Sequence, residues 1–101
     1  MISHLNTHAR QVLEQEVDFI LKNPHVVESS SADVLKAVGI EPSVEAVLSN
    51  FVGAIIARVD TVYRLEMGRN MNSDELLELA GLLKRRVTEM REAFMARRIR
   101  T

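Results

Sequence analysis

The chain has 101 residues, of which 47% are hydrophobic, 27% charged and 4% aromatic, and its formal net charge is −1. This length suits one domain, 1–101, because two folding units would each lie near the roughly 40-residue limit of a self-sufficient core. The apolar share excludes a disordered tail, and the lack of cysteine excludes disulfides and thiolate metal sites. We therefore expect a small, soluble, cytoplasmic domain.

No segment has the pattern of a signal peptide or of a membrane span. Residues 1–10 lack a basic patch followed by an apolar core, which a signal peptide needs. The longest uncharged run, 46–57, has only 12 residues, whereas a spanning helix needs about 20 apolar residues. We predict a buried helix in this region and no membrane partner.

The N-terminal third of the chain predicts one longer helix and one short helix. Apolar residues over 5–22 recur at helical spacing, and Pro24 ends this helix because proline disfavours the α conformation in the residue before it. We interpret 25–28 as a linker and predict the short helix over 31–38. Gly39 fits the left-handed position that closes a helix in a Schellman motif.

The rest of the chain predicts two long helices, about 42–67 and 73–98, separated by a short connection. Gly68 ends the first of them, and Asn72 with Glu75 has the spacing of a capping box at the start of the second. A connection this short favours an antiparallel helical hairpin. The sequence therefore predicts an all-α fold, a small helical bundle built on this hairpin.

The second long helix carries a seven-residue apolar repeat, the spacing of helix–helix contacts. This seam consists of Leu76, Ala80, Leu83, Val87, Met90 and Phe94. Further leucines lie off the seam, and the first long helix is apolar on more than one face. Two antiparallel helices cannot bury all of this surface.

Large exposed apolar patches are typical of interfaces, so we predict a homodimer or an obligate partner that contacts the hairpin. The alternative is a compact monomer in which the predicted short helix, 31–38, and the linker, 25–28, cap the hairpin. The predicted interface residues are Phe51, Ile55, Arg58, Val62, Leu76, Leu79, Leu83, Val87, Met90 and Phe94.

Charged and small residues in the long helices add three expectations. Arg58 shares a stripe with apolar residues, so it points inward, enters the interface, lays its aliphatic stem along the surface or forms a salt bridge to the facing helix. Asp60 and Arg64 have the spacing of an ordinary surface ion pair. Gly81 lies inside the second long helix, where glycine costs about 1 kcal/mol relative to alanine.

The sequence contains no recognisable catalytic or metal-binding constellation. His4 and His8 have a spacing that can hold a metal, but no further ligand accompanies them, and we interpret them as solvated. Asp74 and Glu75 are explained by the positive end of the helix dipole, and nothing in the sequence suggests that they are buried. We expect no enzyme activity, no cofactor and no metal.

Charge is unevenly distributed along the chain. Residues 84–101 hold seven cations and two carboxylates, a net charge of +5, whereas residues 1–83 carry −6. Nucleic-acid binding through this basic end is therefore the main alternative function. Its candidate residues are Lys84, Arg85, Arg86, Arg91, Arg97, Arg98 and Arg100.

Residues 31–50 resemble a helix-turn-helix in outline, but Glu41 and Glu45 would repel phosphate at the start of the recognition helix. The leading interpretation is a non-enzymatic protein-interaction module of the adaptor, inhibitor or regulator type. It would act by presenting helix surfaces to another protein.

Overall fold

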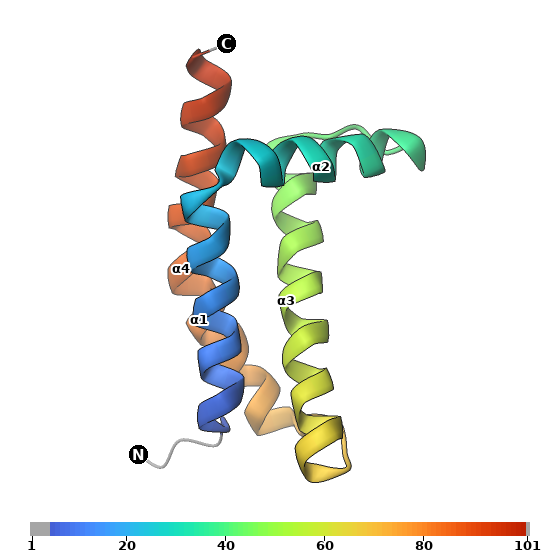
Figure 1. The fold of residues 1–101 in the computed structure, drawn as a ribbon, viewed down its shortest axis with the longest axis vertical. Coiled ribbons are helices and arrows are strands. Elements are labelled where there is room, and N and C mark those ends of the chain that lie inside the picture. Colours follow the sequence, from blue (N-terminus) through green and yellow to red (C-terminus); the bar gives the residue numbers. More distant parts are fainter. Residues whose placement is uncertain (1–4, 101) are drawn as a thin grey trace.

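The computed structural model describes the backbone of residues 5–100 and the side chains of residues 5–96. This part contains four helices and no strand, so the predicted all-α class is confirmed. The helices are α1 (Thr7–Lys22), α2 (Pro24–Ala37), α3 (Val44–Met67) and α4 (Ser73–Arg100). In Figure 1, α3 and α4 leave their connecting turn together, α1 lies in front of α4 and beside α3, and α2 runs across the end of α3 opposite this turn.

The first helix has the face that the sequence predicted. The side chain of Asn6 caps it by accepting hydrogen bonds from the backbone N–H groups of His8, at 2.7 Å, and Ala9, at 3.2 Å. The helix ends at Lys22, before Pro24, as expected. Its buried residues are Ala9, Leu13, Val17 and Ile20.

The second helix is longer than predicted, and the interpretation of 25–28 as a linker is wrong. α2 begins directly at Pro24 and has 14 residues, because proline has no N–H to leave unpaired and already has helical φ at a first helical position. Only Asn23, with φ −131° and ψ 48°, separates it from α1. The proline that stops one helix therefore starts the next.

The end of α2 is the predicted Schellman motif. Gly39 adopts φ +83° and its N–H donates to the carbonyl of Lys36 at 3.0 Å. The N–H of Ile40 donates to the carbonyl of Leu35 at 2.8 Å. Glycine is favoured here because a Cβ would make the left-handed conformation costly.

The third helix starts slightly later than predicted and ends as predicted. Its N-cap is Ser43, whose Oγ accepts from the N–H of Ala46 at 3.1 Å, so the first helical residue is Val44. Its C-cap is Gly68, with φ +68°. Five of its side chains are buried: Val47, Leu48, Ile55, Val59 and Tyr63.

By length and composition alone, α3 is also the one helix within residues 5–100 that could cross a membrane. Core helices of soluble proteins meet the same criteria. The sequence predicts a buried helix in the region of 46–57, which lies within α3.

The capping box of α4 is confirmed in both directions. Asn72 Oδ1 accepts from the N–H of Glu75 at 2.9 Å, and Glu75 Oε1 accepts from the N–H of Asn72 at 2.9 Å. The expectation that Glu75 is a surface residue is wrong, because the residue is only 4% exposed. Arg69 explains this burial, since its two Nη atoms donate to the carboxylate at 2.7 and 2.9 Å.

Hydrogen bonds from Arg69 are the main reason that the pKa of Glu75 falls from 4.5 to about 2, and the Asn72 N–H adds to the effect. The Arg69 guanidinium also lies over the ring of Tyr63, 5.5 Å from its centroid. The Tyr63 hydroxyl in turn accepts from the N–H of Asn6 at 2.6 Å. This network therefore ties the start of α1 to the connection between α3 and α4.

The buried face of α4 differs from the predicted seam in its first half. Leu79 and Leu83 are buried, whereas Leu76 is 44% exposed and Ala80 is exposed. The reason is that α4 packs against α1 as well as α3, so its buried face lies between two neighbours and not toward α3 alone.

Glu75 provides a test of the network through pH. A carboxyl whose pKa is lowered by folding stabilises the native state above its unfolded pKa and loses that contribution as the pH falls through the folded pKa. We expect the free energy of unfolding of the native protein to decline between pH 4.5 and about pH 2. Glu75→Gln should cost about 1–3 kcal/mol near neutral pH and flatten this decline, as measured by urea unfolding. An equally steep decline in the variant would contradict the assignment.

Candidate functional site

A groove lined by exposed apolar side chains lies where the C-terminal end of α1 meets α2 and α3. This α2 groove has a volume of about 420 Å³. Phe19, Val26 and Val34 form its walls and are 56%, 60% and 59% exposed. The groove is lined by Phe19, Val26, Val27, Ser30, Ser31, Val34, Asn50 and Phe51.

Contacts within the chain hold some of the residues that line the α2 groove. Asn50 Nδ2 of α3 donates to Ser31 Oγ of α2 at 2.8 Å. The ring of Phe51 packs against that of Phe94 in the core, with centroids 6.1 Å apart. Two of the residues that line the groove, Asn50 and Phe51, are therefore held in place by contacts within the chain.

The α2 groove was not predicted from the sequence, because residues 25–28 have the pattern of a linker. Val26, Ser30, Val34 and Val38 follow each other in steps of four residues, which places them along one line of a helix. Val38 is 66% exposed, so the apolar line continues past the groove. That spacing was the available signal, but it has meaning only once the helix is known to start at Pro24.

A second groove, the α3–α4 groove, has a volume of about 500 Å³ and lies between the two long helices. Arg58 and Arg86, which form ion pairs with α1, do not line it. Its walls combine apolar side chains with two cations. They consist of Val52, Ile56, Ala80, Leu83, Lys84, Val87, Thr88 and Arg91.

Half of the predicted interface residues are buried inside the chain itself. These are Ile55, Leu79, Leu83, Met90 and Phe94, each no more than 3% exposed. They belong to the core of the chain in this fold, and Leu83 also lines the α3–α4 groove. The prediction counted more apolar surface on the hairpin than its two helices can bury, and α1, which packs against both α3 and α4, covers part of that surface.

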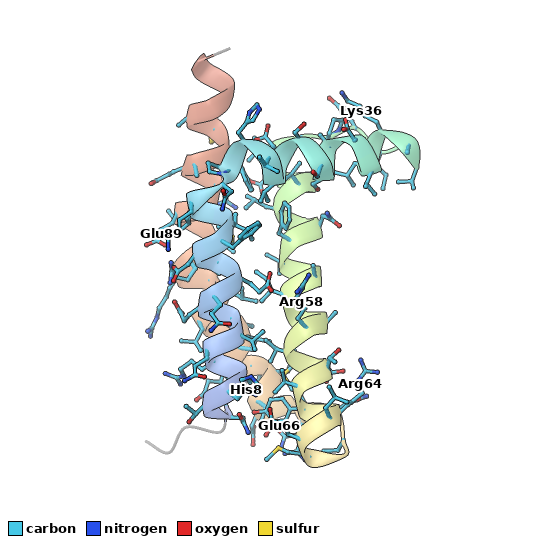
Figure 2. All side chains as sticks on the ribbon, viewed as in Figure 1. His8, Lys36, Arg58, Arg64, Glu66 and Glu89 are labelled. Carbon is cyan, nitrogen blue, oxygen red and sulfur yellow. The ribbon has the colours of Figure 1, made fainter. Side chains whose placement is uncertain are left out.

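The other predicted interface residues have more varied positions. Phe51 and Val87 are half-buried and line the α2 groove and the α3–α4 groove respectively. Val62 is half-buried, and Leu76 is exposed. Arg58 does not point into the core, because its Nη1 donates to Glu16 Oε1 of α1 at 3.0 Å, and Figure 2 shows it between α1 and α3.

Arg86, a candidate for nucleic-acid binding, is instead the centre of an ion-pair cluster. It contacts Glu14 of α1 through Nη1, Asp18 of α1 through Nη2 at 3.2 Å, and Glu89 through Nε at 2.7 Å. Its side chain is 22% exposed. The acidic face of α1 therefore neutralises part of the basic end of the chain.

Arg91 is likewise engaged, since Nε and Nη2 donate to the two carboxylate oxygens of Glu45 at 2.7 and 3.2 Å. These bonds lower the pKa of the Glu45 carboxyl. Lys84 and Arg85 are exposed and form no ion pair within the described residues. The side chains of the other three candidates, Arg97, Arg98 and Arg100, lie outside the described residues.

The histidines and carboxylates form no metal-binding group in the part of the chain that the structure describes. His8 pairs through Nδ1 with Glu66 of α3, and Figure 2 shows the two side chains at the same end of the molecule. No group of three or more potential ligands occurs among the described residues. His4 lies outside them. The predicted surface pair of Asp60 and Arg64 is present, with its closest atoms 3.7 Å apart.

Comparison with known proteins adds no functional assignment. No protein-family model, curated protein or solved structure matches the chain. The function is therefore inferred from the two grooves and from the charges around them.

The Arg86 cluster predicts a measurable loss of stability. Arg86→Met should lower the free energy of unfolding by about 1–2 kcal/mol, because it leaves three carboxylates without their shared cation. Arg85→Met is the matched control, since Arg85 is exposed and has no ion pair within residues 5–96, and should change stability by less than about 0.5 kcal/mol. Chemical denaturation followed by circular dichroism would measure both, and equal losses would contradict a specific role for Arg86.

Proposed function

We propose that the protein is a non-enzymatic protein-interaction module, of the adaptor, inhibitor or regulator type, that binds another protein through the α2 groove. The observation that carries this proposal is the exposure of Phe19, Val26 and Val34 around a groove in which Asn50 donates a hydrogen bond to Ser31. Contiguous exposed apolar side chains cost free energy in a monomer and are typical of binding surfaces.

The chemistry of the groove indicates the kind of partner. None of its eight lining residues is charged, so apolar burial and not ion pairing would supply the affinity. A partner helix with apolar residues at three- and four-residue spacing fits such a groove. Binding that depends on apolar burial should be nearly insensitive to moderate salt.

Two charged substitutions test this proposal. Val34→Asp places a carboxylate on the wall of the groove, whereas Leu65→Asp places one at an 81%-exposed site at the other end of α3. In pull-downs from the host lysate, a specific partner should be retained by the native chain and by Leu65→Asp and lost with Val34→Asp. The identified partner, once purified, should bind the native chain at least about tenfold more tightly than Val34→Asp in calorimetry.

Capture that Val34→Asp leaves unchanged would rule out the α2 groove as the binding site. Equal loss with Leu65→Asp would show that added charge, and not the groove, is responsible.

We further propose that the functional unit is a homodimer that pairs through the surface of its two long helices. The support is the apolar wall of the α3–α4 groove, with Val52 and Ile56 only half-buried. Leu77, which is 70% exposed on α4, extends the apolar surface of that helix.

Nucleic-acid binding is less favoured by the same contacts. Two of its seven candidate residues, Arg86 and Arg91, are held by carboxylates of the same chain. Because each phosphate contact needs an available cation, we expect no gel shift of duplex or single-stranded nucleic acid at about 200 mM salt. Retention at that salt, abolished by Arg97→Ala with Arg98→Ala and Arg100→Ala, would establish the nucleic-acid function instead.

A further inference from the structure

We propose that two copies of the chain pair through antiparallel α4 helices, with the two-fold axis of the dimer at Thr88. This inference rests on the proposed homodimer and is independent of the α2 groove. It is based on a stripe on α4 whose residues are arranged symmetrically about Thr88.

The stripe consists of exposed residues at steps of three, four, four and three. On an α-helix this spacing keeps all of them on one face. The face lies away from the buried positions of α4, such as Leu79, Leu83 and Met90. The residues of the stripe are Gly81, Lys84, Thr88, Glu92 and Met95.

An antiparallel pair with its axis at Thr88 brings complementary residues together. In such a symmetric contact, a residue four positions before Thr88 meets the residue four positions after it in the second copy. Lys84 therefore faces Glu92 of the second copy, and the reverse pair forms as well. A parallel pair would instead place Lys84 against Lys84, which is repulsive.

The ion pairs within the chain leave these two charges available. Of the charged residues around them, Arg86 is held by Glu14, Asp18 and Glu89, and Arg91 by Glu45. Lys84 and Glu92 form no ion pair among the described residues. These two opposite charges stand at equal distances along the helix from Thr88.

The same register also accounts for Gly81, for which the single chain provides no reason. A Cβ added at Gly81 would meet no atom within 4 Å, so no contact in the described part of the chain requires glycine, which is unfavourable inside a helix. Gly81 lies seven positions before Thr88 and Met95 lies seven positions after it, and Met95 is 48% exposed. The pairing places Met95 of the second copy over Gly81, where the missing side chain leaves room.

The α3–α4 groove adds apolar contact area beside the stripe. Lys84 and Thr88 belong both to the stripe and to the wall of the groove, so a second α4 on the stripe lies next to Val87 and Ile56. This matters because exposed ion pairs contribute only a few tenths of a kcal/mol each. Apolar burial would supply most of the affinity, and the charges would set direction and register.

The absence of cysteine from the chain allows a direct test of the axis. Thr88→Cys places two thiols next to each other only if the axis passes there, because a disulfide needs Cα atoms less than about 7 Å apart. Under mild oxidation this variant should form a covalent dimer. Thr61→Cys is the matched control, since Thr61 is an exposed threonine of α3 outside the α3–α4 groove, and it should remain monomeric on a non-reducing gel.

Charge reversal in the Thr88→Cys background tests the register. Lys84→Glu alone and Glu92→Lys alone should each reduce the yield of covalent dimer roughly tenfold at limiting concentration, because each creates two like-charge contacts. The two substitutions together should restore it, since they exchange the charges. Circular dichroism should show the same helix content in all variants, because both sites are exposed.

If Thr88→Cys cross-links no more than Thr61→Cys, the proposed axis is wrong. If the double charge reversal does not restore the yield of covalent dimer, the proposed register is wrong. If the native chain still has the mass of a dimer in either case, the proposed homodimer stands and only its face is wrong. A native chain with the mass of one copy would refute both proposals.

Discussion

The apolar face of α1 is buried against both long helices, and this contact decides which surfaces of the molecule remain available to partners. Ala9, Leu13 and Val17 are completely buried, and α1 contacts both α3 and α4. Residues of α4 such as Leu79 and Met90 are therefore buried between α4 and its neighbours α1 and α3. Among the surfaces left uncovered in the described residues are the walls of the α2 groove and the outer face of α4.

Electrostatic contacts reinforce the same packing. The sequence separates into an acidic body and a basic end, but the fold brings the two together. Arg86 joins α4 to Glu14 and Asp18 of α1, and Arg91 joins α4 to Glu45 of α3. Some of the cations that could bind a polyanion therefore form ion pairs within the chain. Lys84 and Glu92 form none among the described residues and are available for contacts with another molecule.

The parts of the fold that could be predicted from sequence are those specified by a few adjacent residues. The Schellman motif at Gly39, the end of α3 at Gly68 and the capping box of Asn72 with Glu75 each depend on local hydrogen bonds. The start of α2 was missed because Pro24 both ends one helix and begins another. A local stop signal does not specify the conformation of the residues after it.

The candidate surfaces were harder to predict because they depend on how the helices pack. The burial of Glu75 requires Arg69 and Tyr63 from the preceding helix and turn, and no spacing in the sequence shows this. The predicted seam of α4 was wrong at Leu76, which is exposed, because the buried face of α4 is shared between α1 and α3. The α2 groove became visible only with Phe19 and Phe51 placed beside α2.

The proposed interface with a second copy of the chain lies on the uncovered surface of α4. Sedimentation equilibrium of the native chain over a range of micromolar concentrations tests it most directly. The expected result is a mass that rises with concentration from that of one chain, 11.4 kDa, to twice that value. A mass of 11.4 kDa at every concentration would contradict it.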